Sequence, residues 1–243
     1  MKVLLTGATG VAGLGILRVL LADNSVSHVT YLGRRPLPPW VILPNGTSTN
    51  NNSPTHPKLS TIEHKDFLNF PPALQEKIAG HEPASGHWAF QPALKEKGSG
   101  TAENPYRVVF VSGLGADSKE TSRVLFERVK GRAENNLIRA AEESGGRIGA
   151  TIMRPGYFFP SKDYPQDAPN QRGLALRVAD KLFGAPLSLF YSGGVISVEQ
   201  IGQFALAAAR GKWEGKGKVI FENAEMKKFL QNLNESTRSR EEL

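Results

Sequence analysis

The stretch MKVLLTGATGVAGLG, residues 1–15, decides the fold class. Its apolar run Lys2–Leu5 has the leucine and β-branched content of a strand that is buried on both faces. A glycine-rich turn follows over residues 6–13, and the apolar residues of 14–21 then recur at helical spacing. Strand, glycine-rich turn and helix in this order predict the first unit of an α/β, Rossmann-type, doubly wound parallel sheet.

The glycines of this turn have distinct expected roles. Gly7 allows the sharp turn off the strand, Gly10 lets the backbone come close to a ligand, and Gly13 lets the helix pack tightly on the sheet. The unpaired N–H groups at the helix start, with the positive end of the helix dipole, predict a pyrophosphate seat. Its expected residues are Gly7, Ala8, Thr9, Gly10, Val11 and Gly13. The TGATGxxG pattern resembles the extended and atypical branches of the short-chain dehydrogenase/reductase superfamily.

Length and composition narrow the class of protein. A chain of 243 residues fits one large α/β domain over residues 1–243. It has no cysteine, and its 5 histidines lack ligand spacing, so we expect neither disulfides nor a metal site. No apolar run approaches the ~20 residues that span a bilayer. The N-terminus has the pattern of a core strand instead of a signal peptide, so we expect a cytoplasmic protein.

The formal net charge of +7 raises the question of nucleic-acid binding. The basic residues occur in small groups, without a run of five like charges and without interleaved aromatic residues. This pattern favours a solvated basic surface and an anionic cofactor site, with no nucleic-acid partner.

The second predicted strand, His28–Leu32, ends in Gly33-Arg34-Arg35. In a dinucleotide-binding unit the end of this strand meets the adenosine ribose, where a carboxylate accepts from a free 2′-hydroxyl and arginine pairs with a 2′-phosphate. Because two arginines and no acidic residue stand here, we predict that NADP(H) is preferred over NAD(H). A third strand is expected at Leu59–Glu63. By resemblance to the superfamily, Asp66 is expected to bind the adenine amino group, with Phe67 beside the ring.

Two segments lack the expected pattern. Residues 36–58 are polar and rich in proline and asparagine, which predicts a flexible loop. Residues 80–105 are irregular where the superfamily has its fourth strand and a long helix, and only Trp88–Phe90 resembles a strand remnant. The fourth strand and its helix are therefore expected to be missing or shortened. A natural deletion, alternative splicing and an error in the gene model would each produce this pattern.

The second half returns to the pattern with a strand at 106–113, a helix at about 120–144 and a strand at 149–153. The segments VSGLGAD, LFERVKGRAE and MRPGYFFP resemble the atypical short-chain dehydrogenases similar to the HIV Tat-interacting protein and related fungal NAD(P)-binding proteins. The resemblance covers about residues 1–70 and 106–223. It adds Lys130, Pro155 and Gly156 to the expected cofactor-binding residues.

The resemblance also identifies the expected catalytic residues. Active members carry a Tyr-x-x-x-Lys pair in which the tyrosine transfers a proton and the lysine binds the nicotinamide ribose, and a strand serine orients the substrate. Lys130 is retained, but Phe126 stands at the tyrosine position and Gly113 at the serine position. Ser112 is one residue earlier and is expected to point away from the substrate, because a shift of one residue reverses side-chain direction. Tyr157 is a candidate substitute acid.

The remaining segments complete the predicted fold. Residues 161–195, with a helix at 174–183, are expected to form a small substrate-side cap. Ser197 is predicted to cap a helix that ends at Arg210, with Gln200 completing a capping box. A strand at 218–221, a helix at 223–233 and a charged, frayed tail at 234–243 follow.

Three functions are compatible with these patterns. The first is an NADP(H)-dependent oxidoreductase with an unknown small-molecule substrate and a modified proton donor. The second is a binding protein that holds NADP(H) without redox chemistry and acts through a protein partner. The third is a truncated product that binds no cofactor. Phe126 and Gly113 favour the second over the first, and the intact glycine-rich turn argues against the third.

Overall fold

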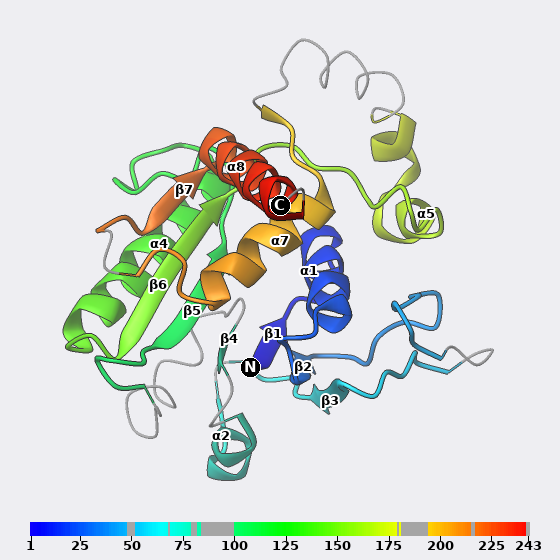
Figure 1. Ribbon diagram of the computed structural model, residues 1–243, viewed down its shortest axis with the longest axis horizontal. Helices are drawn as coiled ribbons and strands as arrows, with labels where there is room; N and C mark the ends of the chain where they lie inside the picture. The colour runs from blue at the N-terminus through cyan, green and yellow to red at the C-terminus, as the bar shows by residue number, and fades with distance from the viewer. Residues whose placement is uncertain are drawn as a thin grey trace.

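The computed structural model describes residues 1–47, 52–67, 69–78, 82–83, 100–178, 180, 194–214 and 217–241. Its parallel strands form one sheet in the order β3-β2-β1-β4 and a second in the order β5-β6-β7 (Figure 1). The strands are β1 (Lys2–Thr6), β2 (His28–Gly33), β3 (Leu59–Glu63), β4 (Glu82–Pro83), β5 (Tyr106–Val111), β6 (Ile148–Arg154) and β7 (Ile220–Glu222). Because β4 contacts β5, the two sheets follow one continuous strand order, as a doubly wound α/β fold requires.

The described part of the fourth strand, β4, covers two residues. It pairs in parallel with β1, with Val3 opposite Glu82 and Leu4 opposite Pro83. Proline has no N–H to donate to a strand ladder, which is one physical reason for the short pairing. The residues on both sides of this pair, 79–81 and 84–99, lie outside the described part of the chain, and with them the strand remnant suggested at Trp88–Phe90.

Helices cover both faces of the sheets (Figure 1). They are α1 (Val11–Ala22), α2 (Pro72–Ile78), α4 (Leu125–Glu143), α5 (Asp167–Gln171), α7 (Val198–Ala209) and α8 (Asn223–Glu241). The main core joins Val3 and Leu5 of β1 to apolar residues of α1, α7 and α8. The alternate residue Leu4 points to the other face, where it clusters with residues of α2. A third cluster packs α4 on β5 and β6.

Helices α1 and α7 approach each other closely at two glycines. A Cβ on Gly15 would lie 2.8 Å from the Cβ of Val198, and one on Gly202 would lie 2.6 Å from Cγ2 of Val19. Larger residues at either position would force the helices apart. The sequence pattern alone assigned no role to these two glycines. At the start of α7, Ser197 and Gln200 form the predicted capping box.

Two helices differ from their predicted ends. α4 begins at Leu125 and not near Glu120. Glu120 has a φ of 60°, and the Asp117 carboxylate accepts hydrogen bonds from the N–H groups of Thr121 (2.6 Å) and Ser122 (2.7 Å), which holds these residues in a loop. At the C-terminus, α8 continues past the predicted end at residue 233 to Glu241. Residues 234–241 contain neither glycine nor proline, so nothing in their composition interrupts the helix.

The predicted flexible loop contains a buried part. Leu37, Val41 and Leu43 are almost fully buried and belong to the main core, although the loop as a whole is polar. Within this loop, Thr47 and Thr55 form an isolated antiparallel β-bridge. The predicted cap includes α5, and residues 174–178 are helical as expected, while residues 179 and 181–193 lie outside the described part of the chain.

Candidate functional site: a cleft at the carboxyl ends of the strands

A cleft of about 700 Å³ opens where β1, β5 and β6 end and where α1 begins. In doubly wound sheets this edge is where ligands bind. The cleft brings the glycine-rich turn together with the β5–α4 region and the segment after β6. Its described lining is Thr6, Gly7, Gly10, Val11, Ala12, Gly13, Ile16, Phe110, Val111, Ser112, Gly113, Leu114, Phe126, Lys130, Pro155, Gly156, Tyr157 and Phe158.

The glycine-rich turn forms a cradle in which side chains would have no room. Gly7 has a φ of 73°, which favours glycine, and its carbonyl oxygen accepts a hydrogen bond of 3.0 Å from the N–H of Gly10. A Cβ on Gly13 would lie 2.0 Å from that same oxygen. The close approach of Gly13 is therefore to Gly7, the first residue after β1. Gly10 caps α1 without a side-chain hydrogen bond, so the helix start is open to an anion.

The two arginines after β2 are tied to this turn by Tyr31. The Tyr31 hydroxyl donates a hydrogen bond of 3.0 Å to the carbonyl oxygen of Arg35 and also interacts with the Thr9 side chain. Burial raises the pKa of the Tyr31 phenol, so it remains a neutral donor. Arg34 and Arg35 are exposed and lie outside the residues that line the cleft. Tyr31 positions the Arg35 backbone beside the turn, a role that was not predicted from the sequence, because a buried tyrosine in a strand has the pattern of an ordinary core residue.

The predicted adenine-binding residues also lie outside the lining of the cleft. Asp66 is exposed, and Phe67 is half-buried. The Phe67 ring packs edge-to-face on Phe70 at 5.9 Å between centroids, next to His64. Ala8 is fully buried behind the turn and does not line the cleft either.

On the α4 side of the cleft, the two positions singled out in the sequence lie in contact. A Cβ on Gly113 would lie 3.2 Å from Cζ of Phe126, so the absent side chain of Gly113 makes room for the phenyl ring. Ser112 is 7% exposed, and among the described residues its hydroxyl has no hydrogen-bond partner. Neither Gly113 nor Phe126 supplies a hydroxyl to the cleft.

Lys130 lies one helical turn further along α4. Its Nζ donates a hydrogen bond of 3.2 Å to the carbonyl oxygen of Val111 and lies 5.0 Å from the Phe110 ring centroid and 5.8 Å from that of Phe126. Burial among these groups lowers the pKa of the Lys130 ammonium. Lys130 is the only charged residue among those described in the cleft lining.

Tyr157 lines the cleft from the segment after β6. Its hydroxyl donates to the Asp180 carboxylate and accepts a hydrogen bond of 2.9 Å from Arg172 Nη1. Burial and the bond to Asp180 raise the pKa of Tyr157, whereas a proton-transferring tyrosine needs a lowered one. Pro155 and Gly156 form the adjacent wall.

An ion-pair network beneath the cleft was not apparent from the sequence. Arg154, immediately before Pro155, donates to both carboxylate oxygens of Glu134, at 2.9 Å and 2.5 Å. It also donates to Glu222 (3.0 Å) and to Ser118 (3.0 Å). Glu134 is fully buried on α4, one turn after Lys130. The network thus joins the helix that carries Lys130 to the wall formed after β6.

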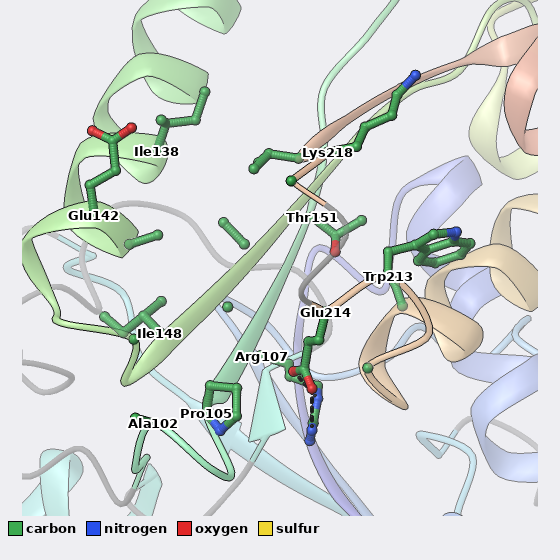
Figure 2. A pocket seen from close by; sticks show the side chains of 18 of the residues that line it. Ala102, Pro105, Arg107, Ile138, Glu142, Ile148, Thr151, Trp213, Glu214 and Lys218 are labelled. Atoms are coloured by element: carbon green, nitrogen blue, oxygen red, sulfur yellow. Dashed lines mark hydrogen bonds and ion pairs between the residues drawn. The ribbon is translucent and has the colours of Figure 1, made fainter.

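A second pocket of about 430 Å³ lies at the opposite end of β5 and β6. Figure 2 shows Ile138 and Glu142 projecting from α4 and the ion pair of Arg107 with Glu214 on another wall. The Arg107 Nη2 atom donates to Glu214 at 2.9 Å, so these charges balance each other. No glycine-rich turn or helix start is among the described residues of its lining, so the first cleft is the stronger candidate for a nucleotide site.

No helix in the described part of the chain is long and apolar enough to cross a bilayer. Within the same residues, no group of three or more histidine, aspartate or glutamate side chains is arranged to hold a metal ion.

The fold and the cleft define a Rossmann-fold protein, and solved short-chain dehydrogenases share this fold. A short-chain dehydrogenase family protein from Francisella tularensis superposes with a TM-score of 0.56 at 12% identity, covering 92% of this chain and 98% of that one. The Pseudomonas aeruginosa RhlG/NADP active-site complex has a TM-score of 0.56 at 16% identity, covering 93% and 96%. These similarities concern the fold.

In sequence, the chain is similar to "Protein FMP52-1, mitochondrial" from Scheffersomyces stipitis. The two are 25% identical over 236 residues, which cover 88% of this chain and 90% of the relative. No family model matches the chain.

Proposed function

We propose that this protein binds NADP(H) in the cleft and that its standard proton-transfer apparatus is absent. The observation that carries the proposal is the contact between Gly113 and Phe126, beside an intact glycine-rich cradle. These are the positions at which the resemblance expects the serine and tyrosine of an active short-chain dehydrogenase. A phenyl ring and a glycine cannot move a proton to or from a substrate oxygen.

The cradle supports the dinucleotide part of the proposal. The open N–H groups of the first turn of α1 suit a pyrophosphate, and a Cβ at Gly13 would close the turn. Lys130 would bind the nicotinamide ribose hydroxyls from α4. When bound, the nucleotide supplies a hydride donor or acceptor, and the residues of this chain orient it beside the buried Phe110.

The preference for NADP(H) rests on Arg34 and Arg35. Both guanidinium groups are exposed at the end of β2, and Tyr31 holds the Arg35 backbone beside Thr9 of the turn. Arginine pairs with a phosphate through two parallel hydrogen bonds, which a free 2′-hydroxyl cannot match. Asp66 and Phe67 remain predicted adenine contacts.

A second candidate function is an oxidoreductase that uses Tyr157 as its acid. The supporting observation is that Tyr157 lines the cleft. Its raised pKa and its bonds to Asp180 and Arg172 argue against it. Replacing Tyr157 with Phe and finding unchanged turnover of a small carbonyl substrate would rule it out.

The test of the proposed function is a fluorescence titration with NADPH and with NADH. We expect NADPH to bind more tightly, and the Arg34→Ala/Arg35→Ala variant to lose this difference. Arg132→Ala/Arg139→Ala removes two exposed charges of α4 away from the cleft and serves as the matched control. Absence of binding by either nucleotide would refute the proposal.

A protein partner and a cytoplasmic location remain predictions, and the similar protein of Scheffersomyces stipitis is named as mitochondrial.

A further inference from the structure

We propose that the cleft distinguishes the redox states of the nucleotide and binds NADPH more tightly than NADP⁺, an inference that rests on the proposed function. The two forms share the same phosphates and adenosine. They differ in the nicotinamide ring, which is cationic when oxidised and neutral when reduced. Residues that contact the phosphates or the adenosine therefore contribute equally to both forms. Charge near the nicotinamide end acts differently on the two forms.

Lys130 supplies that charge. With the pyrophosphate at the start of α1 and the adenosine toward the end of β2, the nicotinamide half extends to the wall formed by β5 and α4. The Lys130 ammonium lies on this wall between the rings of Phe110 and Phe126, and the other residues described in the cleft lining are uncharged. Apolar neighbours screen charge weakly, so a cation here repels a cationic ring more strongly than it would in water.

The acidic groups near Lys130 offset its charge only in part. Glu134, one turn away on α4, attracts the ammonium, but both of its carboxylate oxygens are engaged by Arg154. The Asp180 carboxylate accepts a hydrogen bond from the Tyr157 hydroxyl, and the raised pKa of Tyr157 keeps that group a neutral phenol. A carboxylate oxygen of Asp180 also lies 3.7 Å from Nη1 of Arg172.

Phe126 completes this arrangement. In the active enzymes that the sequence resembles, a tyrosine hydroxyl at this position shares the site with the lysine and can carry negative charge as it transfers its proton. Phe126 has no ionisable group, so the replacement leaves the ammonium unbalanced. The same substitution that removes proton transfer thereby makes the cleft sensitive to the charge of the nicotinamide ring.

The test compares dissociation constants for NADPH and NADP⁺, measured by calorimetry on the whole chain. We expect the wild-type protein to bind NADPH at least about tenfold more tightly. Lys130→Met should bring the ratio of the two constants close to one, and Lys130→Arg should preserve it. Lys119→Met removes an equal charge from an exposed position in the loop before α4 and should leave the ratio unchanged. Phe126→Tyr should lower the ratio of the NADP⁺ dissociation constant to the NADPH dissociation constant.

The outcomes separate this inference from the proposed function. Equal binding of both forms by the wild-type protein, or a ratio that persists in Lys130→Met, would overturn the inference and leave NADP(H) binding intact. If neither form binds the wild-type protein, the proposed function fails and the inference fails with it. If Lys130→Met binds too weakly to measure, the wild-type pH profile decides. Because burial lowers the Lys130 pKa, the preference should disappear as pH rises through that pKa, and a constant ratio refutes it.

Discussion

Replacing Arg154 with Met should destabilise the protein strongly, although Arg154 lies outside the cleft lining. Arg154 is the partner of both oxygens of Glu134, and Glu134 is 0% exposed. Removal of the guanidinium leaves a carboxylate in the interior without its partner. The Glu134 hydrogen bonds raise the Arg154 pKa further above its ordinary value, so the guanidinium is fully charged at neutral pH.

The expected magnitude follows from burial. Breaking a buried ion pair by removing one partner costs about 3–5 kcal/mol. We expect the lower part of this range, because Lys130 offers Glu134 a second favourable charge interaction. For a chain of this size each kcal/mol lowers the melting temperature by about 2–4 °C, so the drop should be on the order of 10 °C.

The assay is urea and thermal unfolding of four proteins. Arg154→Met/Glu134→Leu removes both charges and should be more stable than Arg154→Met alone, since no unpaired charge remains. Arg132 lies on the same helix as Glu134 and pairs with Glu120 of the preceding loop, and its side chain is 68% exposed. Arg132→Met breaks this exposed pair and should cost about 0–1 kcal/mol. If Arg154→Met is no more destabilising than Arg132→Met, the reasoning is wrong.

Two further predictions compare glycines that differ in their surroundings. Gly13→Ala places a Cβ 2.0 Å from the carbonyl oxygen of Gly7, so we expect a titration to show loss of NADPH binding. In Gly10→Ala the new Cβ lies 3.4 Å from the same oxygen, an ordinary contact, and this variant should keep the fold. A Gly13→Ala variant that binds NADPH normally would contradict the cradle geometry. Gly202→Ala overlaps Val19 and should cost about 1–3 kcal/mol in thermal unfolding. Gly173→Ala has nothing within 4 Å and should change stability little; equal effects of the two would refute the close α1–α7 packing.

Much of the fold could be predicted from the sequence, because it depends on patterns between neighbouring residues. The apolar runs of β1 and β2, the bounds of α1 and the capping box at Ser197 are properties of short segments. The late start of α4 could not be predicted in the same way. It depends on how the Asp117 carboxylate binds the N–H groups that follow it, and this geometry competes with an otherwise helical pattern.

For the candidate site, the sequence by itself determined which residue types are present: a glycine-rich turn, two arginines, a lysine, and a phenylalanine and a glycine at the expected catalytic positions. Only the tertiary structure decided which of them meet. It placed Phe126 against Gly113, isolated Lys130 as the single charge described in the cleft lining, and buried Glu134 against Arg154. The physical reason is that these contacts join residues far apart in the chain, and their side-chain directions are set by how α4 packs on β5 and β6.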